Sequence, residues 1–409
     1  MPGGWGSFLT PDLWRLFAHQ LLDSGAMLPR VIATGWLVLE VTDSPFWVGA
    51  VFGIEGLVLL SCGGLGGVLA ARVERRRTLA AVQGALALVL IAIAALSALE
   101  VLRLWHLVAA AVLTGLARCL HLPLSTGLLQ RAAGQGQLMR AMGAKQLTFN
   151  IGRMAGSALV GVTISALGFA AAFLLLAVIR AGAAAVLARL SPELGRPAPV
   201  TRSRPVFLDL VRQLRYTLRV PRVRAVFAMS MLMELCVFSV SSMMPVLARD
   251  VLGVGAGALG GLTAAGSFGA ILFGMVMTAA GELRSKGSVA MLACLLCGVA
   301  LIGYALSRWF LVSVGIAVVL GVAMMVYDVM LFTLVQVTVP SSRRDQSTGL
   351  LAQTFGLNPV GSTLAGAVAQ VAGMPAALLA AGGIIVAYAL AVLAPKRRLW
   401  DRPDVRKPG

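Results

Sequence analysis

Charged residues are scarce in this chain. Only 12% of its 409 residues are Asp, Glu, Lys or Arg, whereas 59% are hydrophobic. A water-soluble domain carries about a quarter charged residues and covers much of its surface with them. The shortage of charge therefore excludes a soluble globular protein of this length.

Acidic residues are the scarcer kind, with 16 Asp and Glu against 34 Lys and Arg, which gives a net charge of +18. In a soluble protein this excess would suggest nucleic-acid binding. Here the basic residues are concentrated in alternate loops between long apolar stretches, which is a mark of membrane topology. They also favour contact with anionic lipid headgroups. We therefore expect a lipid bilayer, and no nucleic acid, as the partner.

The five cysteines all lie in apolar stretches, and Cys294 and Cys297 form a C-x-x-C without a second ligand pair. Buried core residues explain this better than zinc or a disulfide. The sequence also lacks a Walker A pattern, a G-x-S-x-G elbow and a metal-ligand cluster. These absences disfavour an ATP-driven pump or a membrane hydrolase, and we expect no enzyme activity, metal or cofactor.

Long apolar stretches are what the chain has instead. A helix needs roughly 20 apolar residues to cross the hydrocarbon core, because every backbone polar group must be satisfied internally there. Twelve stretches meet this length, near residues 13–39, 46–70, 79–99, 104–129, 141–167, 170–190, 226–248, 257–280, 289–306, 310–335, 349–372 and 376–393. The predicted fold class is an all-α membrane protein of two six-helix bundles.

Arginines occur in every second turn between these spans, whereas the other turns carry Glu40, Asp43 and Glu100. Short cytoplasmic loops hold the excess of Lys and Arg. This pattern predicts a multi-pass protein of a bacterial plasma membrane, with both termini in the cytoplasm. We expect it to be a monomer.

The composition divides the chain into a first bundle at 1–190, a basic linker at 191–224, a second bundle at 225–394 and a basic tail at 395–409. Within the linker, residues 207–218 space leucine and valine among arginines, which predicts an amphipathic helix on the membrane surface. The two bundles also resemble each other: Gly156 to Gly161 matches Gly361 to Gly366, and Gly115 and Gln130 align with Gly321 and Gln336 at a common offset. A smaller alignment sets Asp23 opposite Glu234. We infer a duplicated six-helix unit.

Four acidic residues fall inside predicted spans, where an ionisable side chain costs several kcal/mol unless it meets water or a partner. They are the candidates for proton coupling: Asp23, Glu55, Glu234 and Asp328. Candidates for lining a substrate cavity are His19, Arg30, Arg118, Asn150, Arg153, Ser230, Phe238 and Tyr327. The alternative is that these groups pair only to hold helices together, since ion pairs also perturb titration without any function.

Two loop and helix motifs carry a family resemblance. The turn after the second span reads Gly67-x-x-x-Ala71-Arg72-x-Glu74-Arg75-Arg76, and the fifth span contains Gly152, Gly156, Ser157 and Gly161. These segments are similar to motif A and to the antiporter motif C of the major facilitator superfamily. With the turns at 42–45 and 247–253, the chain looks most like the enterobactin-exporter and macrolide-efflux branch.

The resemblance implies a twelve-helix secondary transporter that exchanges protons for an amphiphilic small molecule such as a siderophore, macrolide or metabolite. It also implies a cytoplasmic gate at Gly67, Arg72, Glu74, Arg75 and Arg76. Two positions depart from the family pattern: Ala71 replaces the motif A aspartate, and Ser157 replaces the motif C proline. Charge pairing at the gate must therefore differ, with Glu74 as the candidate replacement.

Two other functions fit the same sequence. The protein could import or facilitate the entry of a metabolite or lipid, or it could be a sensor or scaffold that transports nothing. We expect Asp23→Asn or Glu55→Gln to abolish proton-driven efflux in a folded protein if these acids carry the coupling.

Overall fold

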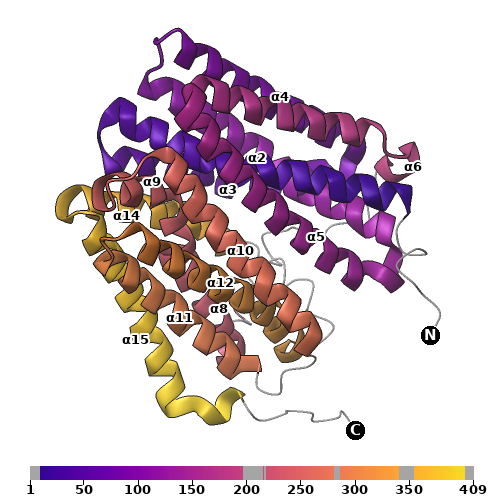
Figure 1. Ribbon diagram of the computed structural model, residues 1–409. Helices are drawn as coiled ribbons and strands as arrows, with labels where there is room; N and C mark the ends of the chain where they lie inside the picture. Colours follow the sequence, from indigo (N-terminus) through magenta and orange to yellow (C-terminus); the bar gives the residue numbers. More distant parts are fainter. Residues whose placement is uncertain (1–9, 197–214, 216–217, 281–285, 340–353, 401–409) are drawn as a thin grey trace.

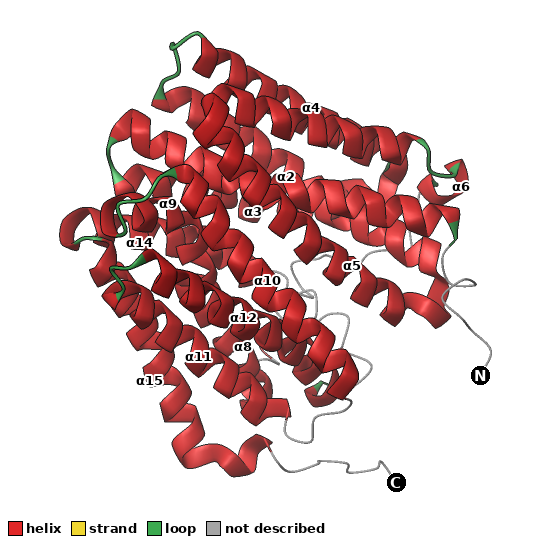
Figure 2. Ribbon diagram, in the orientation of Figure 1, coloured by secondary structure: helices red, strands yellow, loops and turns green. Residues whose placement is uncertain are grey.

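The computed structural model describes residues 10–196, 215, 218–280, 286–339 and 354–400. All regular structure in these residues is helical (Figure 2). Nine described helical stretches are long and apolar enough to cross a bilayer, and one of them, Arg140–Ala188, has 49 residues, enough for two crossings. Two further helices complete the twelve spans that the sequence predicts. They are the first span, α2 (Pro11–Thr42), which carries several charged residues, and the eleventh span, the short α14 (Asn358–Ala372).

The N-terminal half comprises residues 10–196. Its helices are α2 (Pro11–Thr42), α3 (Pro45–Arg72), α4 (Arg75–Ala98), α5 (Leu104–Ala188) and the short α6 (Pro192–Gly195). Glycines at positive φ, Gly134 at 65° and Gly168 at 80°, break α5 into the fourth, fifth and sixth spans. Glycine adopts this backbone region without steric penalty, so the chain reverses at these points with almost no loop.

The C-terminal half comprises residues 218–400. Its helices are α8 (Pro221–Met233), η1 (Glu234–Phe238), η2 (Ser239–Met243), α9 (Met244–Val246), η3 (Leu247–Val251), α10 (Ala256–Ala280), α11 (Lys286–Leu306), α12 (Phe310–Thr338), η5 (Phe355–Leu357), α14 (Asn358–Ala372) and α15 (Met374–Trp400). The run from α8 to η3 is one irregular seventh span. It contains Pro245, which lacks the backbone N–H that a regular helix needs.

The bundle has two ends. We call the end where α2 meets α3 the Asp43 end, and the end where α3 meets α4 the Arg75 end. One apolar cluster joins both halves and includes Val38 and Val48 with Val240 and Leu247. A second cluster at the Arg75 end consists of residues of the N-terminal half alone. The hydrophobic core therefore connects the halves toward the Asp43 end.

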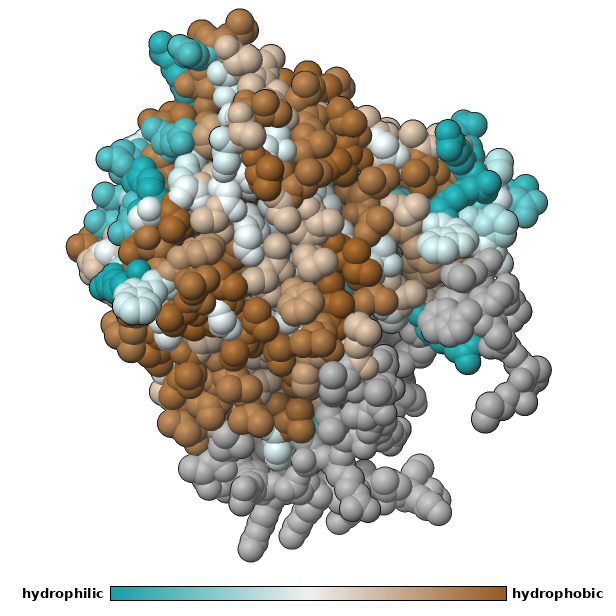
Figure 3. All heavy atoms as spheres, viewed as in Figure 1, coloured by the Kyte–Doolittle hydropathy of each residue, from teal (hydrophilic) through white to brown (hydrophobic). Residues whose placement is uncertain are grey.

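Contacts between the halves follow the same distribution. In the described residues they run from the Asp43 end to the level of Leu60, which meets Gly356, and of Arg153, which meets Ser267. Beyond that level the helices of the two halves diverge toward the Arg75 end (Figure 1). The surface of the molecule is apolar over most of the face in Figure 3, as a membrane protein requires.

Glycine contacts confirm the internal repeat. Gly156 of α5 faces Gly25 of α2, and its counterpart Gly361 of α14 faces the Leu235 carbonyl of η1. In the same way, Gly161 meets Gly260 of α10. The counterpart pair across the pseudo-dyad is Gly366 of α14 and Gly49 of α3. Each half thus packs its fifth span on its own first span and on the second span of the other half.

The predicted amphipathic helix at residues 207–218 falls outside the described residues, except for positions 215 and 218.

Candidate functional site

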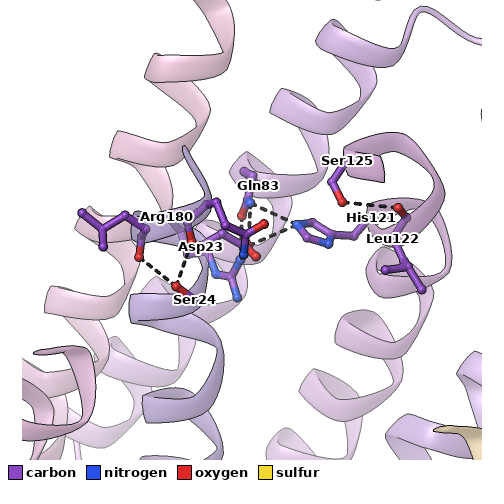
Figure 4. A network of polar contacts seen from close by, with 9 residues as sticks. Asp23, Ser24, Gln83, His121, Leu122, Ser125 and Arg180 are labelled. Atoms are coloured by element: carbon purple, nitrogen blue, oxygen red, sulfur yellow. Dashed lines mark hydrogen bonds and ion pairs between the residues drawn. The ribbon is translucent and has the colours of Figure 1, made fainter. Parts of the chain in front are cut away.

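Asp23 lies in a buried polar network inside the N-terminal half (Figure 4). Its side chain is 3% exposed. Its Oδ1 accepts a hydrogen bond of 2.8 Å from Gln83 Nε2, pairs with Arg180, and lies 3.1 Å from Nε2 of His121. Arg180 also donates to Gln83 over 2.8 Å. The network joins α2, α4 and two spans of α5, so it ties four of the six spans together.

Glu55 of α3 forms a second buried network. Its two carboxylate oxygens accept hydrogen bonds of 2.9 and 3.0 Å from Nη2 of Arg30. A third bond of 2.9 Å comes from Nη1 of Arg118. Arg30 and Arg180 line one small cavity, so the two networks are neighbours inside the same half.

Both acids of the N-terminal half are therefore neutralised by arginines of the same half. The sequence left open whether Asp23 and Glu55 couple protons or pair with basic residues, and this geometry favours pairing. A coupling role for them stays a prediction. Arg180 and Gln83 were not among the predicted site residues, although a charged residue in the middle of the sixth apolar span was a sufficient signal for Arg180.

Glu234 occupies a different environment in the C-terminal half. It is 5% exposed and begins η1, a π-helical turn in the seventh span. Such turns are rare and are frequent at functional sites. Its carboxylate interacts with the side chain of Asn358 at the start of α14. In the described residues no Lys or Arg forms a salt bridge with Glu234, in contrast to Asp23 and Glu55.

Asp328 of α12 is the second acid predicted to lie inside the membrane spans of this half. It is partly exposed and forms no salt bridge within the described part of the chain. Charged groups within electrostatic range of it include Arg153 of α5, from the opposite half, and Glu234 of its own half. Arg153 donates from Nε to Ser267 Oγ of α10 over 3.0 Å, and its guanidinium lies 6.0 Å from the ring centroid of Phe149. Arg153 thus lies at the contact between the two halves.

The repeat explains how the two halves differ. Asp23 aligns with Glu234, and the offset that aligns Gly115 with Gly321 aligns His121 with Tyr327. His121 contacts Asp23 at 3.1 Å, whereas Tyr327 lies within electrostatic range of Glu234. No counterpart of Arg180 faces Glu234 among the described residues. Duplication has kept an acid at the same place in each half, but among the described residues only the first acid has an arginine partner.

The remaining predicted cavity residues divide between the halves. His19 is buried near His121, with ring centroids 6.3 Å apart, and Asn150 is buried on α5 with its amide bonded to the Gln146 carbonyl. In the C-terminal half, Ser230 bonds Thr354 over 2.7 Å, and Phe238 packs at 6.3 Å from Tyr327. Ser230 and Phe238 stand one helical turn before and after Glu234, and Tyr327 packs near Phe238. A cavity-lining role for the three residues stays a prediction.

At the predicted gate, Glu74 pairs with Arg77 over 2.9 Å and with Arg76 over 3.5 Å. Arg76 also donates to the Leu190 carbonyl over 2.8 Å. Arg75 packs its guanidinium against Gly127 of α5, and Arg72 is exposed at the end of α3. Gly67 lies in α3, but its surroundings fall outside the description. The described contacts of Glu74, Arg75 and Arg76 stay within the N-terminal half.

The motif C-like glycines place α5 between two helices. A Cβ on Gly152 or Gly156 would collide with Ser24 or Gly25 of α2. The next residue, Ser157, contacts Gly260 of α10 through its carbonyl oxygen, and Gly161, one turn later, also contacts Gly260. Small residues let helix backbones approach closely, and here they do so both within one half and across the halves.

This arrangement, with two six-helix units related by a pseudo-dyad and joined at one end, is the architecture of a known family. Residues 24–358 match the model of the Major Facilitator Superfamily. The chain belongs to the Major Facilitator Superfamily. It is therefore a secondary transporter of a small molecule and not an enzyme. No curated protein matches the chain closely enough to indicate a substrate.

Solved structures of this superfamily share the fold at low sequence identity. The nucleoside transporter NupG is 15% identical, with a TM-score of 0.73, covering 94% of this chain and 99% of that chain. A mutant of the peptide transporter POT in complex with alafosfalin is 15% identical, with a TM-score of 0.76 and coverage of 97% and 96%. A bacterial homolog of the human lysosomal transporter Spinster is 13% identical, with a TM-score of 0.70 and coverage of 94% and 96%. These likenesses show the fold alone.

Proposed function

We propose that this transporter moves an amphiphilic small molecule in exchange for protons, and that Glu234 and Asp328 bind the protons. The observation that carries the proposal is the contrast between the halves: Asp23 and Glu55 are held by arginines, whereas Glu234 and Asp328 form no salt bridge in the described residues. An acid without a cation in the middle of a membrane must bind a proton or meet water. Either condition suits a group that exchanges protons.

Alternating access supplies the transport cycle. The contacts that join the halves lie toward the Asp43 end, and the halves diverge toward the Arg75 end (Figure 1). If the Arg75 end is cytoplasmic, as its arginine-rich turns predict, this state would admit a molecule from the cytoplasm. Rocking of one half against the other about the central glycine contacts would then expose it to the outside.

Export is the direction that the motif C-like glycines support, through their resemblance to antiporters. A siderophore, a macrolide or another amphiphilic metabolite would suit the apolar side chains of the seventh and tenth spans, among them Phe238 and Met330. Met side chains are flexible and adapt to bulky apolar ligands.

The test is a proton-flux assay in proteoliposomes. The purified transporter is reconstituted with the pH-sensitive dye pyranine inside, a pH gradient is imposed, and macrolides, siderophores and dyes are added in turn. A compound that collapses the gradient through the wild-type protein should do so at least tenfold more slowly with Glu234→Gln or Asp328→Asn. Glu100→Gln, which changes an exposed acid in a turn, is the matched control.

The proposal is wrong if both variants collapse the gradient at the wild-type rate. The sidedness of uptake in the same vesicles separates export from import. If the protein is a sensor or scaffold that transports nothing, none of the added compounds should collapse the gradient.

A further inference from the structure

Charges of opposite sign are segregated between the two halves. The membrane-spanning core of the N-terminal half holds five basic residues, Arg30, Arg118, Lys145, Arg153 and Arg180, against two acids. In the C-terminal half the core acids are Glu234 and Asp328. The described basic residues between positions 225 and 395 are Arg249, Lys286 and Arg308, and all three lie at helix ends. The membrane core of the N-terminal half is therefore basic, and that of the C-terminal half is acidic among the described residues.

Two basic residues of the N-terminal half remain after the internal pairs are formed. Arg30, Arg118 and Arg180 are held by Asp23 and Glu55, but Lys145 forms no salt bridge in the described part of the chain. Arg153 is bonded only through Nε, to Ser267, so its two terminal nitrogens make no hydrogen bond with described residues.

Lys145, Phe149 and Arg153 occur four residues apart and so share one face of α5. Both cations on this face are partly exposed, and Lys145 lines a pocket with His19 and Gln20 of α2. Arg153 is the member of this face that reaches the other half, where it meets Ser267 and the field of Asp328. We call Lys145, Phe149 and Arg153 the basic face.

We propose that the transported molecule is a zwitterion: its anionic group binds Arg153 and Lys145, and its cationic group binds Asp328 and Glu234. The inference rests on the proposed function, because it requires Glu234 and Asp328 to face the cargo. A molecule with one charge could pair with only one of these two sets, the cations or the carboxylates. A zwitterion satisfies both sets, and its cationic group takes the place of the protons, as exchange requires.

On the basic face the ring of Phe149 lies near the Arg153 guanidinium. In the C-terminal half, Phe238 packs near Tyr327, which precedes Asp328 in the chain. An apolar group of the transported molecule, attached near its two charged groups, would pack on these rings. The proposed class is thus an amphiphilic zwitterion with both charges near one end of an apolar group.

Three fluorescent probes of one size test this class. Nε-dansyl-L-lysine is zwitterionic, its methyl ester is only cationic, and its Nα-acetyl derivative is only anionic. Binding is measured by dansyl fluorescence to the transporter in lipid nanodiscs, with empty nanodiscs subtracted. The wild type should bind the zwitterion at least tenfold more tightly than either derivative. Arg153→Gln should bind the zwitterion and the ester equally well, but the acetyl derivative still more weakly. Asp328→Asn should bind the zwitterion and the acetyl derivative equally well, but the ester still more weakly.

Arg308→Gln, an exposed arginine at a helix end, should bind like the wild type. The inference is overturned if the wild type binds the three probes within twofold of one another, if it binds none of them, or if Arg153→Gln weakens all three equally. The proton-flux assay with Asp328→Asn is read separately. Wild-type proton flux in both Asp328→Asn and Glu234→Gln would overturn the exchange proposal. Slowed proton flux together with equal binding of the three probes would overturn only the zwitterion.

Discussion

Arg249 and Asp43 connect the two halves of the transporter across the Asp43 end. Nη2 of Arg249, in η3, donates to Oδ1 of Asp43 over 2.7 Å. Nη1 of the same guanidinium donates to the Leu39 carbonyl at the end of α2 over 3.3 Å. Asp43 stands in the left-handed region with φ of 47° and caps α2 through its own backbone N–H. The turn that ends the first span thereby supplies the contact that closes this end.

Arg249→Gln should loosen the Asp43 end. The Asp43 side chain is exposed and that of Arg249 is about one-third exposed, so the ion pair contributes no more than about 1 kcal/mol. We expect the population open at this end to rise up to roughly fivefold. Distances between spin labels placed on α2 and α10 at this end measure the change.

Arg103→Gln provides the control for Arg249, because it removes an exposed arginine from a turn at the same end. An unchanged distance distribution in Arg249→Gln would show that the ion pair does not help to close this end.

Gly260→Ala should separate the halves. The new Cβ would lie 2.6 Å from the Ser157 carbonyl oxygen and 2.8 Å from Cα of Gly161, both of them backbone atoms that cannot rotate away. Overpacking of this kind costs about 1–3 kcal/mol. The variant should favour the state in which α5 and α10 are apart, and accessibility of a cysteine introduced at this contact to a thiol reagent measures it.

Gly261→Ala is the matched control for Gly260, since the next residue of the same helix has nothing within 4 Å of its added Cβ. It should be neutral or slightly stabilising, because alanine favours a helix over glycine by about 1 kcal/mol. Equal effects of the two substitutions would show that the close backbone contact is unimportant.

Arg180→Gln should destabilise the N-terminal half. Asp23 would remain buried with a neutral partner, and removing one member of a buried ion pair costs about 3–5 kcal/mol. The double variant Asp23→Asn and Arg180→Gln should recover part of this loss, because neither charge is then left alone. Thermal unfolding of the four proteins in one detergent measures the coupling. Additive effects would mean that the two groups do not interact.

The sequence predicted the general position of the twelve spans, since the length of each apolar stretch is set by the bilayer. It also predicted the pseudo-dyad, because the alignment of Gly156 with Gly361 requires equivalent contacts, and Gly25 and the Leu235 carbonyl provide them. It did not predict the partners of Asp23. Gln83 and Arg180 lie far away in the chain, and helical spacing on α2 says nothing of which helices pack against it.

The sequence by itself determined that this protein crosses a membrane with two related helical units, because hydrophobic length and internal similarity are properties of the chain. Only the tertiary structure decided which acids are neutralised. Asp23 and Glu234 hold equivalent places in the repeat, yet the sixth span brings Arg180 to the first, whereas no described basic residue forms a salt bridge with the second. The ionisation of a buried acid depends on its neighbours in space, and packing chooses those neighbours.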